Sequence, residues 1–140
     1  MTLRMTGLLC FVAFLPFLAL GLETNPVDFE TYPVKLTIFN ELTNEKTPFS
    51  SSVIEGGVLF GVLNNLQKSN NGFSFTYSIH DDFGIFLESV NRVAGSNEDQ
   101  TYWELLTESE GILIRLDIGV GCYQPKKDEH IVLRFTTWKK

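Results

Sequence analysis

The chain has 140 residues, 44% of them hydrophobic, with 11 Lys and Arg against 17 Asp and Glu and a formal net charge of −6 at pH 7. Nucleic acids and anionic membrane surfaces are bound by clustered Lys and Arg, so this acidic balance argues against both as partners. The basic pairs Lys126-Lys127 and Lys139-Lys140 have the character of a solvated turn and a tail.

The first 21 residues have the pattern of a secretory signal. Arg4 precedes an apolar run over residues 8–20, and Gly21 supplies a small residue at the start of a polar stretch. Pro16 interrupts the run, which also falls short of the ~20 apolar residues that a membrane-spanning helix needs. We therefore expect residues 1–21 to be cleaved off and the chain to be secreted into the extracellular space.

The next part of the chain predicts two strands and one helix. Residues 22–32 are polar and form a lead-in to a single domain over residues 33–140. Alternation over residues 33–39 predicts a strand, and residues 49–54 predict a second strand at a sheet edge. Over residues 58–68 apolar side chains recur at i, i+3, i+4 and i+7, which places them on one face of a helix. These side chains are Leu59, Val62, Leu63 and Leu66.

The remaining sequence predicts further short strands. Residues 73–79 alternate aromatic and aliphatic side chains with small polar ones, which is the strongest strand pattern in the chain. The other extended segments, separated by turns and by a polar loop at 91–100, are 84–90, 102–106, 112–116 and 131–137. Several strands with one helix predict an α+β fold, in which a twisted sheet packs on that helix and leaves its other face partly open.

No residue pattern indicates an enzyme. His80 beside Asp81 and Asp82 could form a metal or acid/base cluster, but a solvated turn is the simpler interpretation. His80 and His130 belong to no Ser-His-Asp or Cys-His pattern, and one cysteine with two distant histidines is too few ligands for a zinc site. We therefore expect no catalysis, no metal and no intrinsic cofactor.

Cys122 is the cysteine that remains once the signal is removed. Since Cys10 would leave with the signal, no disulfide within the chain is expected. Three alternatives remain open for Cys122: a buried thiol, an exposed thiol, or half of a bridge between two chains.

Five short blocks carry the most specific information in the sequence. They are Glu55-Gly56-Gly57 followed by Leu63, Phe83-Gly84-Ile85-Phe86-Leu87-Glu88-Ser89-Val90, Tyr102-Trp103-Glu104-Leu105-Leu106, Gly119-Val120-Gly121-Cys122-Tyr123, and the tail over residues 125–138. In order and spacing, over residues 33–138, they resemble the C-terminal domain of the transcobalamin, intrinsic factor and haptocorrin family. Each block is weak alone, and five in register are specific.

The resemblance implies both a fold and a ligand. The fold would be β-grasp-like, and the function would be binding and transport of cobalamin, whose corrin ring the family holds between a larger helical domain and this small one. Contacts to the ring would come from segment 81–87 and from loop 116–120, with Trp103 either as a wall or as core. The residues carried over are Asp81, Phe83, Gly84, Phe86, Leu87, Trp103, Leu116, Ile118, Gly119 and Val120.

The sequence also departs from the family pattern. Cys122 stands in place of an Asp, and Ile118 replaces a polar residue, which would remove a hydrogen bond to a ring amide. The sequence contains no counterpart of the helical domain, so either the affinity is much lower than in the family or a second protein domain or a homodimer closes the site. The alternative interpretation is a secreted protein-interaction module that keeps the fold without binding cobalamin.

Overall fold

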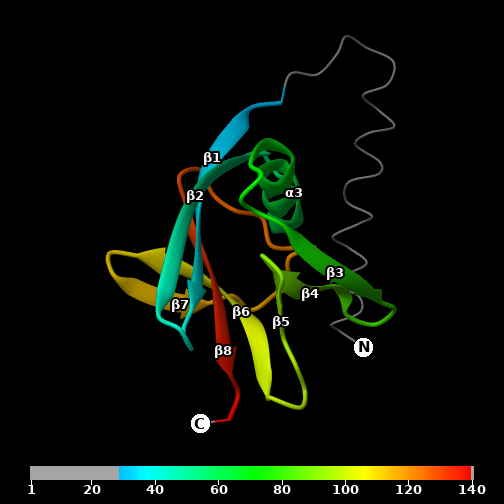
Figure 1. Cartoon of the computed structure of the whole chain (residues 1–140). Coiled ribbons are helices and arrows are strands. Elements are labelled where there is room, and N and C mark those ends of the chain that lie inside the picture. The colour runs from blue at the N-terminus through cyan, green and yellow to red at the C-terminus, as the bar shows by residue number, and fades with distance from the viewer. Residues whose placement is uncertain (1–28, 140) are drawn as a thin grey trace.

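The computed structural model describes residues 29–139, so the predicted signal peptide and most of the predicted lead-in lie outside the described residues. Within that range lie one helix and eight strands (Figure 1). In chain order they are β1 (Thr31–Asn40), β2 (Glu45–Ile54), α3 (Leu59–Ser69), β3 (Phe75–His80), β4 (Gly84–Val90), β5 (Val93–Ala94), β6 (Thr101–Ser109), β7 (Ile112–Arg115) and β8 (His130–Thr137). The helix and each strand segment predicted from the sequence are confirmed, with ends that differ by a few residues. Over residues 29–139 no helix is both long and apolar enough to cross a bilayer.

The larger sheet has five strands in the order β2-β1-β8-β6-β7. β1 pairs antiparallel with β2 and parallel with β8, and β6 pairs antiparallel with both β8 and β7. A hairpin, a helix and a last strand that returns parallel beside the first give the β-grasp-like arrangement. The predicted α+β class and the predicted edge position of β2 are both confirmed.

The expectation of one sheet is wrong, because a second sheet forms in the order β3-β4-β5. β5 lies inside the segment expected to be a polar loop. Asn91 and Arg92, between β4 and β5, have positive φ angles of 49° and 70°, so a two-residue turn reverses the chain there. A strand of two residues has no measurable periodicity, which is why the sequence gives no sign of it.

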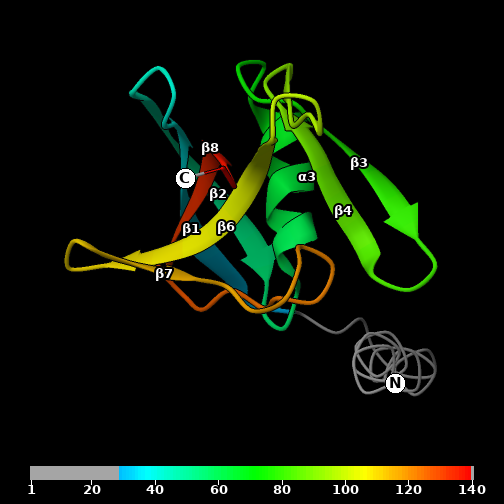
Figure 2. The same ribbon diagram turned by 90° about the horizontal axis from the view of Figure 1, so that it is seen from below.

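The hydrophobic core lies around α3, which sits between the two sheets (Figure 2). α3 buries the four side chains predicted for its apolar face. From the five-stranded sheet the fully buried partners are Val34, Leu36, Ile131 and Leu133, and from the second sheet Val90. On the other side of α3, the ring of Phe60 packs edge-on against Phe75, with centroids 5.8 Å apart. The second sheet therefore covers a face of α3 that the first sheet leaves open.

Candidate functional site

The structure places in contact the two segments that the family resemblance selected. A Cβ atom at Gly119 would lie 3.6 Å from the carbonyl oxygen of Ile85 in β4, and one at Gly121 would lie 3.3 Å from the Ile85 side chain. The loop after β7 therefore runs along the β3–β4 hairpin. At Gly119 a Cβ would make an ordinary van der Waals contact, whereas at Gly121 it would be tight enough that the Ile85 side chain would have to shift by a few tenths of an ångström.

The loop is also fixed to the start of α3. Val58 gives the helix no side-chain cap. Instead, the N–H groups of Leu59 and Phe60 donate to the carbonyl oxygens of Tyr123 and Val120 at 2.7 and 2.8 Å. Because the first N–H groups of a helix have no partner within it, these loop carbonyls satisfy them. The loop is thereby held by both the helix and the hairpin.

Tyr123 connects this loop to the turn before β8. Its hydroxyl donates to a carboxylate oxygen of Glu129, whose other oxygen accepts the N–H of Lys126 at 2.8 Å. Burial and the neighbouring carboxylate raise the pKa of the Tyr123 phenol above its usual value. Burial alone would raise the pKa of Glu129, but the hydrogen bonds from Tyr123 and Lys126 outweigh it and hold that pKa below 4.5. The pair is therefore a neutral phenol donating to a carboxylate at neutral pH.

We expect Tyr123→Phe to lower the free energy of unfolding by about 1 kcal/mol at pH 7, less than a fully buried charged hydrogen bond because the pair is partly solvated. Since the folded pKa of Glu129 is depressed, its contribution is present above the unfolded pKa and fades as the pH falls below about 4.5. Since the folded pKa of Tyr123 is raised, its contribution is present below pH 10 and fades above that. Thermal melts of both proteins from acid to alkaline pH measure the difference, and a gap that stays constant below pH 4 would contradict this assignment.

The ten residues predicted to contact a ligand fall into two groups by exposure. Leu87, Trp103 and Val120 are buried and can only support a surface from behind. Trp103 is 8% exposed, and its indole N–H donates to the carbonyl oxygen of Val93 at 2.8 Å, which places it in the core. The others reach solvent to differing extents: Asp81, Phe83, Gly84, Phe86, Leu116, Ile118 and Gly119.

Phe86 lies on the opposite face of the hairpin from the loop. Paired residues share a face, and Ile79 pairs with Ile85 whereas Phe86 pairs with Ser78. Ile85 points toward Gly121, so Phe86 points away, where its ring meets His80 edge-on at 5.7 Å. The predicted residues therefore do not all lie on one flat surface.

The sequence prediction missed the apolar side chains that share the loop's side of the hairpin. Ile79, which is 74% exposed, pairs with Ile85 there, and Tyr77 lies one step along the same face. The ring of Tyr77 stands edge-on to Phe60 of α3 at 4.8 Å. The alternation of residues 73–79 predicts the strand, but it does not by itself say which of its side chains stay exposed. We call Tyr77, Ile79, Ile85 and loop 116–120 the hairpin–loop surface.

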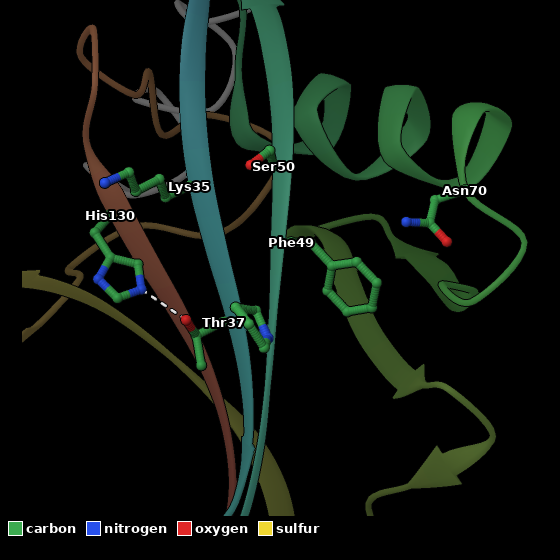
Figure 3. Close-up of a pocket in the computed structure, with 7 residues that line it drawn as sticks. Lys35, Thr37, Phe49, Ser50, Asn70 and His130 are labelled. Atoms are coloured by element: carbon green, nitrogen blue, oxygen red, sulfur yellow. Dashed lines mark hydrogen bonds between the residues drawn. The ribbon is translucent and has the colours of Figure 1, made fainter.

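A separate cavity of about 530 Å³ opens at the β2 edge of the five-stranded sheet (Figure 3). Lys35, Thr37 and His130 line it from the polar face, and Phe49 and Asn70 line it from the side of α3. Beside it the Thr37 hydroxyl lies 2.7 Å from Nε2 of His130, and Nδ1 of His130 lies 2.8 Å from Oε1 of Glu108. Hydroxyl, imidazole and carboxylate are thus joined as in a catalytic triad. However, β1 is paired on both sides, so its N–H groups are held in the sheet and offer no donors for an oxyanion. We interpret this chain of contacts as structural.

Two further features bear on the sequence predictions. Within residues 29–139 no group of three or more His, Cys, Asp or Glu side chains is arranged to hold a metal ion. The side chain of Cys122 is a partly buried thiol, and the backbone N–H of Cys122 donates to the carbonyl oxygen of Gly119 at 3.2 Å. A disulfide bridge from Cys122 to a second chain stays one of the predicted alternatives.

Sequence comparison finds relatives that match most of this chain over about a quarter of their own length, and no protein-family model matches. The chain is 32% identical over 117 residues to cobalamin binding intrinsic factor of Canis lupus familiaris and 31% identical over 117 residues to that of Homo sapiens. In both, the match covers 81% of this chain and 27% of the relative. Transcobalamin-1 of Homo sapiens is 26% identical over 119 residues, which is 84% of this chain and 26% of that protein. The predicted family resemblance is confirmed, and the intrinsic factors are named for binding cobalamin rather than for a reaction, in agreement with the prediction of a non-enzyme.

Solved structures share the fold. The structure of haptocorrin in complex with Cbi matches with a TM-score of 0.68 and 24% identity, over 84% of this chain and 28% of that one. A metal-binding-protein candidate from Ruminococcus gnavus matches with a TM-score of 0.57 and 13% identity, over 76% of this chain and 97% of that one. At these identities the two matches show the shared fold.

Proposed function

We propose that this chain, a homologue of the C-terminal region of intrinsic factor, transcobalamin-1 and haptocorrin, is a secreted domain that binds the corrin ring of cobalamin or a related corrinoid. The observation that supports this most is the homology to cobalamin binding intrinsic factor over 81% of the chain. The contact of the loop with β4 at Ile85 supports it further, because it joins two segments far apart in sequence into one surface. Secretion rests on the signal pattern of residues 1–21.

The chemistry of the hairpin–loop surface suits such a ligand. A corrin ring is a broad, mostly apolar plate with amide groups at its edge, and flat aromatic and aliphatic side chains cover such a plate well. Tyr77 and Ile79 are exposed apolar side chains beside a loop in which Ile118 and Gly119 are also exposed. The side chains would cover the ring, and backbone N–H and C=O groups would bond its amides.

This surface is open on one side. Phe83 at the tip of the hairpin is 77% exposed, and the cavity of Figure 3 is lined by other residues. Ligand pockets usually cover 70–90% of a small molecule, so one open face gives weaker binding than a closed site. A second protein domain or a second copy of the chain would complete the enclosure.

Titration of the secreted chain, residues 22–140, with hydroxocobalamin and with cobinamide tests this proposal. We expect a change in the corrin absorbance spectrum and a saturable heat of binding, with Kd in the range of about 1–100 μM for a one-sided surface. Heme is the control, because it is a macrocycle of similar breadth without the rim of amides. No saturable signal with either corrinoid, or equal binding of heme, would contradict the proposal.

The second candidate is a secreted protein-interaction module. The exposure of Phe83 and the apolar Ile118 in place of a polar residue favour it, since exposed apolar patches often mark protein contacts. The same titration separates the two candidates, because a protein-interaction module would not bind corrinoids.

A further inference from the structure

β7 is an edge strand with an unusual surface. Its four residues are all exposed, whereas the strand beside it, β6, is largely buried. Three of the four are large aliphatic side chains: Ile112, Leu113 and Ile114, exposed to 63%, 40% and 57%. β7 pairs with β6 on one side only.

The opposite edge of the same sheet is protected against pairing, and β7 is not. β2 carries Lys46, Pro48 and the polar run 50–52. Lysine, proline and polar residues are the features that keep an edge strand from pairing with another chain. β7 has none of them before Arg115 at its end. This difference between the two edges indicates that the β7 edge is available for pairing with another strand.

The free backbone groups of β7 can be assigned from its turn. Glu110 and Gly111 form a two-residue turn with positive φ angles of 52° and 83°, so the flanking Ser109 and Ile112 bond each other. Hydrogen-bonded and non-hydrogen-bonded pairs alternate along β6 and β7, and this alternation continues to the end of β7, since the N–H of Leu116 donates to the carbonyl oxygen of Leu105 at 3.0 Å. The N–H and C=O groups of Leu113, and likewise of Arg115, therefore point away from β6.

We propose that β7 pairs antiparallel with β7 of a second copy of this chain, across a two-fold axis that passes beside Leu113. In this register Leu113 faces its own equivalent through two hydrogen bonds, and Ile112 faces Ile114 of the second copy. The strand is acidic at its turn, with Glu110, and basic at its other end, with Arg115. Only an antiparallel copy brings each Arg115 beside the turn that carries Glu110 of the second copy, and a two-fold axis makes this contact twice.

The pairing joins the two five-stranded sheets into one continuous sheet and leaves the hairpin–loop surface free. Figures 1 and 2 both show β7 at the opposite end of the molecule from β3 and β4. The dimer would therefore carry two separate, outward-facing hairpin–loop surfaces. This inference does not depend on corrinoid binding and can be tested without any ligand.

Sedimentation velocity of residues 22–140 tests it. We expect a dimer at about 100 μM that dissociates on dilution, and at least about 100-fold weaker association for Ile114→Lys, because the charge meets an apolar partner side chain. Ile54→Lys is the matched control, since Ile54 lies on the β2 edge and is 49% exposed; it should leave the dimer intact. A monomer at every concentration, open-ended larger species, or equal effects of the two variants would overturn the proposal.

A crosslink tests the register independently. In a Cys122→Ser background, Leu113→Cys should form a disulfide-linked dimer under mild oxidation, since hydrogen-bonded antiparallel pairs hold their Cα atoms about 5.5 Å apart, within disulfide range. Ile54→Cys in the same background should stay monomeric on a non-reducing gel. Equal crosslinking of both variants would reflect random collision and would overturn the register.

Discussion

Replacing Ile79 by aspartate should remove corrinoid binding while leaving the fold intact. Ile79 is 74% exposed and pairs with Ile85 on the face of the hairpin that meets loop 116–120. A carboxylate there would be covered by the apolar ring without a partner, which costs several kcal/mol, and about 3 kcal/mol corresponds to a loss of about 100-fold in affinity. Because the side chain contributes little to the core, the melting temperature should stay within error of the parent chain.

Two further variants decide which face of the hairpin binds. Phe86→Asp places the same charge on the opposite face, so it should weaken binding far less than Ile79→Asp. Leu42→Asp, in the turn between β1 and β2, is the control for an exposed apolar side chain far from both faces. Isothermal titration with cobinamide compares the three variants. Loss of binding in Phe86→Asp alone would move the site to the other face and contradict the hairpin–loop surface.

Replacing Glu104 by leucine should be the most destabilising single change on the polar face of the five-stranded sheet. Glu104 is buried, and its Oε1 accepts hydrogen bonds from Nε and Nη2 of Arg134 at 3.0 and 2.8 Å. Its Oε2 lies 3.6 Å from Nε of Arg115. Without the carboxylate the two guanidinium groups have no counter-charge between them. We expect a loss of about 3 kcal/mol, at the low end for a broken buried ion pair because the side chain of Arg134 is 24% exposed.

A double variant separates lost packing from unpaired charge. Glu104→Leu combined with Arg134→Leu removes both members of the pair, and replacing a buried ion pair by apolar residues is often neutral. The double variant should therefore recover most of the stability lost by Glu104→Leu alone. Urea denaturation of four chains, the parent, Glu104→Leu, Arg134→Leu and the double variant, measures the coupling. Additive losses would show that the ion pair contributes no more than its parts.

The sequence by itself determined the local elements and the family. The spacing of Leu59, Val62, Leu63 and Leu66 predicts a helix whose buried face is the observed one, because helical period is a property of neighbouring residues. The polar residues 50–52 predicted the edge position of β2 for a similarly local reason, since polar side chains are typical of strands that pair on one side only. The five blocks selected two segments, 81–87 and 116–120, that we propose to meet the ligand, and the contact between Gly119 and Ile85 shows that these segments lie side by side.

Only the tertiary structure decided which side chains of the hairpin share a surface. Between the pairs Thr76–Ser89 and Tyr77–Leu87 the register shifts, so β4 contains one extra residue, Glu88. A one-residue shift turns every later side chain to the other face of the strand, which is how Leu87 and Val90 are both buried while Phe86 is exposed. Such a bulge depends on pairing between two segments and leaves no period in either one. The family pattern could therefore name Phe86, whereas the pairing of Ile79 with Ile85 had to come from the fold.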